Sequence, residues 1–209
     1  MIVLMIVIGA AAGFLALKVS RGLIRSRVGE LPDSILVSGK VAPMFWCILS
    51  SAGYGVIYLA SDRTYVVVES ALVFTLCLCI GAVDWVIRKI PNSLLLALIC
   101  SKAVFLLINR NSDEVKKSLW GCAVATVIFV IPMLFRLYIG AGDIKLAIVT
   151  GLYLGISGFL QAMIIMALLI TFYGIYLVIR KQGGFKTKTA MGPYLAFGFI
   201  CTLLFPIIN

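Results

Sequence analysis

The stretch Gly140-Ala141-Gly142-Asp143-Ile144-Lys145 stands at the start of an apolar run, where a membrane helix is expected to begin. An ionised Asp within hydrocarbon costs about 3 kcal/mol even on a lenient insertion scale. The two glycines give the backbone freedom and leave room for another chain to approach closely. One other acid has a comparable setting, Asp84, at the end of another apolar run. Two such acids suggest a pair of carboxylates that act together.

The composition of the whole chain is that of a membrane protein. Of its 209 residues 63% are hydrophobic and 12% are charged, and the mean hydropathy is +1.15. Several segments approach the ~20 apolar residues that cross a bilayer as a helix. We therefore expect an all-α, polytopic helical membrane protein, with residues 1–209 forming a single integral-membrane domain.

Apolar runs separated by polar turns predict about eight transmembrane helices. Their approximate ranges are 2–17, 41–60, 65–84, 93–108, 119–138, 144–156, 158–179 and 191–207. Residues 1–64 then form an N-terminal two-helix part with a short polar loop, 18–40, and residues 65–209 form a core. Gly9 with Gly13, and Gly151 with Gly155, are spaced for close helix packing.

The basic residues indicate how the chain is oriented. Of the 18 Lys and Arg residues, 13 lie in the four loops that eight spans put on one side. These loops are residues 18–40, 84–92, 136–145 and 180–190. Because positive charge marks the cytoplasmic side, both termini are expected outside, with Asp84 and Asp143 near the cytoplasmic face. Charges in such loops favour membrane lipids as partners and argue against nucleic acid, despite the net charge of +10.

The chain has no histidine, which excludes a Ser-His triad, a Cys-His pair and a His-Glu-x-x-His zinc site. The six cysteines lie in or beside apolar runs without a Cys-x-x-Cys pair, so we expect no metal site and no cofactor. They are Cys47, Cys77, Cys79, Cys100, Cys122 and Cys201. Glu69, near the other end of the span that carries Asp84, is interpreted as an interfacial anchor.

Two carboxylates that share a site do not both ionise easily, so one holds a proton while the other acts as a base. In peptide hydrolysis the base activates water and the acid protonates the carbonyl oxygen. The alternative is that each acid is structural, Asp84 pairing with Arg88 and Asp143 with Lys145. For either acid alone this alternative is the better one. Both acids together, in a chain without histidine, favour the catalytic interpretation.

These residues resemble a known family. Gly-x-Gly-Asp-x-Lys at 140–145, together with Asp84 ahead of Arg88-Lys89-Ile90-Pro91-Asn92, is similar to the type IV prepilin peptidases, which are membrane aspartyl proteases. Met191-Gly192-Pro193-Tyr194-Leu195-Ala196 resembles a Gly-Pro-(Phe/Tyr)-Leu-Ala segment near the C-terminus of that family.

The resemblance implies that Asp84 and Asp143 are the catalytic pair. It gives motif or supporting roles to Pro91, Asn92, Gly140, Gly142, Lys145, Gly192 and Pro193. The substrates would be prepilins or pseudopilins, cleaved after a glycine that ends a short basic leader, at the cytoplasmic face of the bacterial inner membrane.

One feature departs from the longer, bifunctional members of the family. Those members carry a large cytoplasmic loop with zinc-binding Cys-x-x-Cys pairs, linked to N-methylation of the new N-terminus. The corresponding loop here, 18–40, is short and has no cysteine. The chain is therefore expected to be a short form without zinc or methyltransferase activity.

Three other functions stay open at this point. The same motif occurs in preflagellin-type and other Gly-x-Gly-Asp proteases with different substrates. A proton-coupled small transporter also places acids in membrane helices. Its acids are expected nearer the midplane and its halves are expected to match, and the sequence shows no internal repeat. The third alternative is a non-catalytic assembly subunit with the same fold.

The predicted orientation can be tested by cysteine labelling. Single cysteines at Gly29 and Gly183 should resist a membrane-impermeant thiol reagent in intact cells, because both positions lie in loops predicted to be cytoplasmic. A cysteine at Asn111 should react. The background protein must show no labelling of its native cysteines. Labelling at Gly183 from outside would reverse the orientation and move both acids to the other face.

Overall fold

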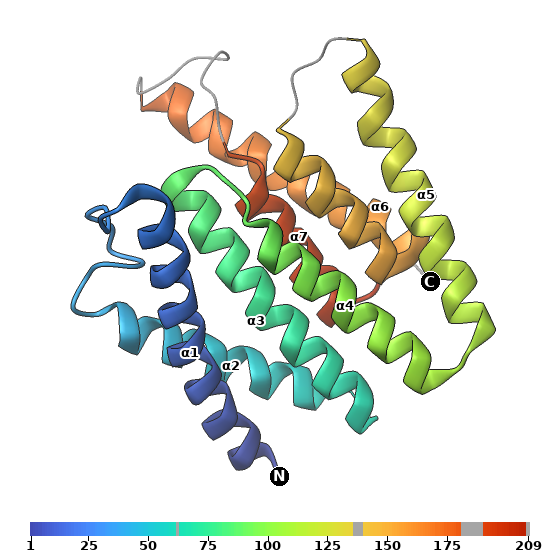
Figure 1. Ribbon diagram of the computed structural model, residues 1–209, viewed down its shortest axis with the longest axis horizontal. Coiled ribbons are helices and arrows are strands. Elements are labelled where there is room, and N and C mark those ends of the chain that lie inside the picture. Colours follow the sequence, from blue (N-terminus) through green and yellow to red (C-terminus); the bar gives the residue numbers. More distant parts are fainter. Residues whose placement is uncertain (62, 136–139, 181–189, 208–209) are drawn as a thin grey trace. The chain divides into compact units, whose positions relative to one another are not determined.

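The computed structural model describes residues 1–61, 63–135, 140–180 and 190–207 (Figure 1). Over these ranges the chain forms seven α-helices and no β-strand, which confirms the all-α prediction. The helices are α1 (Ile2–Val28), α2 (Ala42–Ala60), α3 (Thr64–Ile87), α4 (Asn92–Asn109), α5 (Ser112–Leu134), α6 (Ala141–Ile179) and α7 (Gly192–Leu204).

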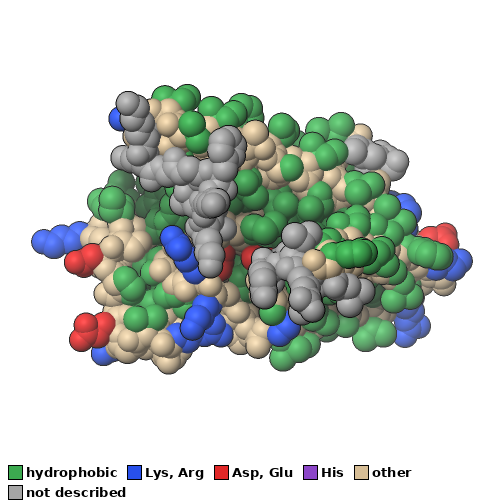
Figure 2. Space-filling model, turned by 90° about the horizontal axis from the view of Figure 1, so that it is seen from above, with side chains coloured by type: hydrophobic (Ala, Val, Ile, Leu, Met, Phe, Trp, Pro, Cys, Tyr) green, Lys and Arg blue, Asp and Glu red, His purple; other side chains and the backbone are tan. Residues whose placement is uncertain are grey.

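Six of these helices, α1 to α6, are long and apolar enough to cross a membrane. Many large apolar side chains are exposed along these helices, and Figure 2 shows such side chains on the surface together with Lys, Arg, Asp and Glu. Extensive exposed apolar surface is typical of proteins that contact a membrane. The prediction of a helical membrane protein is therefore confirmed. The seventh helix, α7, has only 13 residues, which is shorter than the predicted span 191–207.

Helix α6 replaces two of the predicted spans. It has 39 residues, about twice the number that crosses a bilayer. Gly155 interrupts it with φ 69° and ψ −169°, a conformation open to glycine but not to residues with a Cβ. The chain changes direction there (Figure 1), so the parts before and after Gly155 correspond to the predicted spans 144–156 and 158–179.

Two helix ends lie outside their predicted ranges. Helix α1 continues eleven residues past Leu17 to Val28, and α5 begins at Ser112 instead of near Leu119. In both cases the added turns contain several charged residues. Parts of two predicted cytoplasmic loops, 136–139 and 181–189, lie outside the described residues.

The chain divides into two compact units, Met1–Arg110 and Asn111–Asn209. The first contains α1 to α4, with α1 packed on both α2 and α3. Gly9 and Gly13 bring α1 against the backbone of α2: a Cβ on Gly9 would stand 2.8 Å from the carbonyl oxygen of Ser50. The predicted role of these two glycines in close helix packing is confirmed.

The segment between α1 and α2 is more ordered than a polar loop. Val37 is fully buried in a hydrophobic cluster with Ile24 of α1 and Val83 of α3. Arg21 Nε donates a hydrogen bond to the Val37 carbonyl at 2.8 Å, and Trp46 Nε1 donates one to the Leu36 carbonyl at 2.8 Å. These contacts attach the segment to the ends of α1 and α2.

Glu69 has a different role from the interfacial anchor expected from sequence. Its Oε1 lies 3.0 Å from Nζ of Lys102, so an ion pair joins α3 to α4, and both side chains are nearly buried. Two charges within apolar helices are tolerated when they compensate one another and keep their hydrogen bonds. The pair fixes the register between α3 and α4.

The second unit is built on glycine contacts between helices. Gly151 of α6 lies against the backbone of Gly121 of α5, with no space for a side chain on either residue. Helix α7 meets α6 where a Cβ on Gly198 would stand 2.6 Å from the Ala162 carbonyl oxygen. Gly151 thus serves helix packing as predicted, since small residues let helix backbones approach closely in a membrane.

We expect the Glu69–Lys102 pair to show strong non-additivity. Lys102→Met or Glu69→Leu alone leaves one charge in an apolar setting and should lower the unfolding free energy by about 3 kcal/mol. The double variant Glu69→Leu/Lys102→Met removes both charges and should lose less than either single variant. Unfolding in mixed detergent micelles measures this, and a double loss equal to the sum of the single losses would contradict it.

Candidate active site

Asp84 lies in the last turn of α3, three residues before the helix ends at Ile87. The residue is only 4% exposed, and its neighbour Val83 is fully buried with Ile24 and Val37. Val83 therefore fixes the rotation of α3 about its axis at this level. An acid in such a position is costly, because burial disfavours the charged form of a carboxyl group.

The residues after Asp84 reverse the chain into α4. Arg88 takes the left-handed conformation (φ 51°), and its backbone N–H donates to the Asp84 carbonyl at 2.8 Å, which closes α3. Ile90 and Pro91 are buried, and Pro91 is the N-cap of α4. Asn92, the first residue of α4, is exposed. The Arg-Lys-Ile-Pro-Asn stretch is thus a helix-to-helix turn directly beside Asp84.

Asp143 lies in the first turn of α6, three residues after Gly140, the N-cap. It is half-buried, and the N–H of Ile144 donates to the Gly140 carbonyl at 3.1 Å. The positive end of the helix dipole favours a negative charge at this position. The sequence therefore places this acid where a helix can support its ionised form.

Gly140 makes room for the carboxylate of Asp143. A Cβ on Gly140 would stand 2.8 Å from Asp143 Oδ2, closer than two such atoms pack. The backbone of Gly140 (φ −60°, ψ 129°) is open to any residue, so space explains this glycine better than flexibility does. Gly142 is half-buried in the same turn, and Lys145 is exposed.

The Gly192-Pro193-Tyr194-Leu195-Ala196 segment forms the start of α7. Pro193 occupies the first turn, where its missing N–H costs nothing. Gly192, Leu195 and Ala196 are buried, as is Phe199 one turn further on, whose ring lies 5.5 Å from that of Tyr153 on α6. In this structure the segment packs α7 onto α6.

Asp84 belongs to the first unit and Asp143 to the second, so their meeting in one site stays a prediction. Among the described residues, no group of three or more His, Cys, Asp or Glu side chains is arranged to hold a metal ion. All six cysteines are free thiols.

Residues 71–175 match the type IV leader peptidase family, and this range is just over half of the chain. The chain belongs to the type IV leader peptidase family. Comparisons with curated proteins and with solved structures gave no match. The protein is therefore an integral membrane protease of the leader peptidase kind, and both Asp84 and Asp143 lie within the matched range.

The leader peptidase also contains a charge that the sequence analysis did not single out. Lys102 lies in the middle of the apolar helix α4, and its partner Glu69 is on the neighbouring helix α3. The available signal was the rarity of any charge inside a membrane span, which marks Lys102 as a residue that needs a partner.

We predict that Gly140→Ala impairs the peptidase without unfolding it. The added Cβ collides with Oδ2 of Asp143 and displaces the carboxylate, while the backbone conformation suits alanine. Cleavage of a prepilin-like substrate should fall about tenfold or more, since small misplacements of reacting groups are costly. Gly174→Ala is the matched control, because a Cβ there meets nothing within 4 Å. Equal cleavage rates in the two variants would contradict the role given to Gly140.

Proposed function

We propose that this leader peptidase is an aspartyl endopeptidase that uses Asp84 and Asp143 as a catalytic pair. Its substrates are type IV prepilins or pseudopilins, from which it removes the short basic leader after a glycine. The cleavage takes place at the cytoplasmic face of the bacterial inner membrane. Lys145, Pro91, Asn92, Gly142, Gly192 and Pro193 support the site.

The main support for this proposal is the position of the acids in the range of residues that matches the family. Residues 71–175 contain four acids, and two of them, Asp113 and Glu114, lie in the first turn of α5. Asp113 is exposed and pairs with Lys116 at 3.5 Å. The other two are Asp84, buried at the end of α3, and Asp143, next to Gly140 in the first turn of α6.

The proposed reaction needs no group beyond two carboxyls and water. One carboxylate takes a proton from water, whose oxygen adds to the scissile carbonyl carbon while the other carboxyl gives its proton to the carbonyl oxygen. The C–N bond then breaks: the first carboxyl gives its proton to the leaving amine nitrogen, and the second carboxylate takes back a proton from a hydroxyl of the tetrahedral intermediate as the carbonyl re-forms. The products are the leader, which ends in a carboxylate, and the mature N-terminus.

The substrate class agrees with the charge distribution of the chain. A leader that stays in the cytoplasm brings its scissile bond to the cytoplasmic ends of the spans, where the basic loops are predicted to lie. Asp84 and Asp143 are each within one turn of a helix end, which supports a site near the membrane surface. The segment between α1 and α2 has no cysteine, which supports peptidase activity without zinc-linked methyl transfer.

The pair is tested by Asp84→Asn and Asp143→Asn, which keep the size of the side chain and remove its ionisable group. Each variant should abolish cleavage of a prepilin-like peptide by the purified protein, while insertion and accumulation stay normal. The double variant should be scarcely worse than either single one, because residues that act as a unit are strongly non-additive. Asp→Glu at either position should also fail, because the extra methylene displaces the carboxyl.

Asp33→Asn is the control, since Asp33 is an exposed acid between α1 and α2. It should cleave at the normal rate. Normal cleavage by a well-expressed Asp143→Asn protein would end the dyad hypothesis. Asn variants that cleave but fold poorly would instead favour the structural interpretation of both acids.

A further inference from the structure

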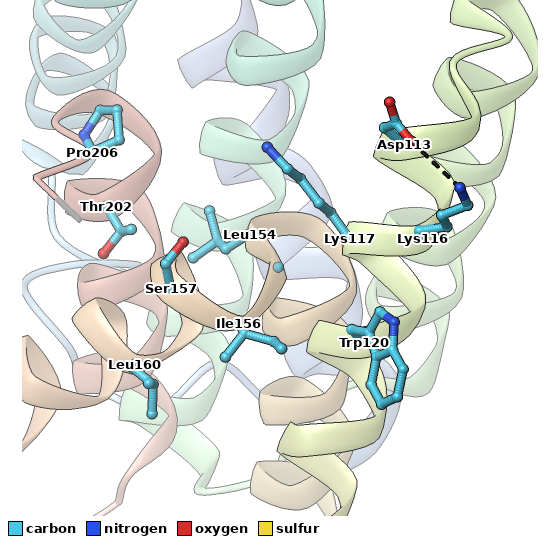
Figure 3. A pocket seen from close by; sticks show the side chains of 12 residues that line it. Asp113, Lys116, Lys117, Trp120, Leu154, Ile156, Ser157, Leu160, Thr202 and Pro206 are labelled. Carbon is cyan, nitrogen blue, oxygen red and sulfur yellow. Dashed lines mark ion pairs between the residues drawn. The ribbon is translucent and has the colours of Figure 1, made fainter. Parts of the chain in front are cut away.

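A second polar feature lies in the unit Asn111–Asn209, away from Asp143. A cavity of about 940 Å³ opens between the start of α5, the kink of α6 and the end of α7 (Figure 3). Gly155, at the kink, is twelve residues after Asp143, which corresponds to about 18 Å along the helix. The cavity is thus a separate feature from the first turn of α6.

The part of the cavity contributed by α5 is cationic. Lys116, Lys117 and Asp113 all line it, and Lys116 pairs with Asp113 at 3.5 Å. Both side chains of that ion pair are exposed to solvent, so the pair restrains Lys116 only weakly. Lys117 forms no ion pair with any described residue, and Figure 3 shows it reaching from α5 over the cavity while Lys116 turns toward Asp113.

The part contributed by α6 is mostly apolar. Leu154, Ile156 and Leu160 line it, and Trp120 of α5 lies at its edge. Tryptophan is common where a membrane helix meets the polar headgroups. A cationic side and an apolar side on membrane-spanning helices are the features that an anionic amphiphile requires.

The kink of α6 adds polar groups of the right kind. Because Gly155 is not helical, the second half of α6 begins at this point, and the first residues of that half, Ile156, Ser157 and Gly158, line the cavity. The free N–H groups of a helix start favour anions. Thr202 of α7 also lines the cavity, with a buried hydroxyl that has no hydrogen-bond partner in the described part of the chain.

The wall formed by α7 is held in place by hydrogen bonds to α6. Gln161 Nε2 donates to the Phe205 carbonyl at 2.7 Å, and the N–H of Ile207 donates to Gln161 Oε1 at 2.9 Å. These bonds fix the backbone on both sides of Pro206, which lines the cavity. The cavity is therefore bounded by ordered backbone on two helices and does not depend on a loop.

We propose that this cavity binds an anionic phospholipid, whose phosphate contacts Lys117 and the start of the second half of α6. Leu154, Ile156 and Leu160 contact the upper part of its acyl chains. A lipid is the occupant that the surroundings favour, because α5 and α6 are long and apolar enough to span a membrane and a basic pocket beside such helices suits an acidic headgroup. The proposal does not depend on the proteolytic mechanism.

The test uses the full-length protein in detergent micelles and measures lipid binding by native mass spectrometry. The probes are phosphatidylglycerol, which is anionic, phosphatidylcholine, which is zwitterionic, and inorganic phosphate. Phosphatidylglycerol should bind more tightly than phosphatidylcholine, and added salt should weaken its binding. Inorganic phosphate should neither bind measurably nor displace it, because it lacks the acyl chains.

Variants should then assign the binding to Lys117. Lys117→Ala should weaken phosphatidylglycerol binding about fivefold, the effect of one lysine at an anionic surface. Alanine keeps the Cβ that lies over Gly155, so the kink should stay packed and the lipid-free unfolding midpoint should not change. Lys117→Arg should bind as the wild type does. Asp113→Asn should bind more tightly, since a negative charge has been removed from the cavity.

Lys40→Ala is the control, because Lys40 is an exposed lysine in the other unit, between α1 and α2. It should bind phosphatidylglycerol normally. Equal binding of the two phospholipids, or unchanged binding in Lys117→Ala, would overturn the proposal. Displacement of the lipid by an acidic peptide that binds more tightly would also overturn it, in favour of a protein partner. Failure of the wild-type protein to cleave a prepilin-like peptide, with normal lipid binding, would count only against the proposed function.

Discussion

Charged groups within apolar helices must be compensated by the protein itself, and this constraint shapes the leader peptidase. Hydrocarbon offers no hydrogen bonds, so a charge in it needs a partner or a position at a helix end. Glu69 and Lys102 meet this requirement through an ion pair between α3 and α4. Asp143 meets it at the start of α6, where the helix dipole favours an anion. Asp84 is buried in the last turn of α3, at the end of a helix that the dipole makes unfavourable for an anion.

The helical class followed from the apolar runs, but several helix ends did not. Helix α1 continues to Val28 and α5 begins at Ser112, because a helix keeps its backbone hydrogen bonds in polar turns that a search for apolar residues leaves out. The kink at Gly155 was anticipated only as a boundary between two spans. Its conformation could not be read from sequence, since glycine also packs helices without bending them, as Gly9 does.

The acids of the candidate site could be selected from sequence because their neighbours form recognisable motifs. Interaction partners that come from distant parts of the chain could not be selected in this way. Lys102 is 33 residues from Glu69, and no local pattern connects the two. Gly140 was selected for backbone freedom and for room that another chain could use, yet its backbone conformation is ordinary and the space is used by Asp143 Oδ2. A sequence can indicate that a position requires glycine. It does not show which atom occupies the space left by the missing Cβ.

The position of Asp143 depends on contacts further along α6. Gly151 is eight residues beyond Asp143, about 12 Å along the helix, and it touches the backbone of Gly121. Backbone contacts of this kind leave no side chain that could adjust, so the first half of α6 cannot slide along α5 without losing them. Gly155 then gives the second half of α6 another direction, and α7 packs on that half through Gly198 and on the first half through the contact of Phe199 with Tyr153. The first half of α6 is thus fixed to α5, and Asp143 is carried on a rigid element, as its proposed catalytic role requires.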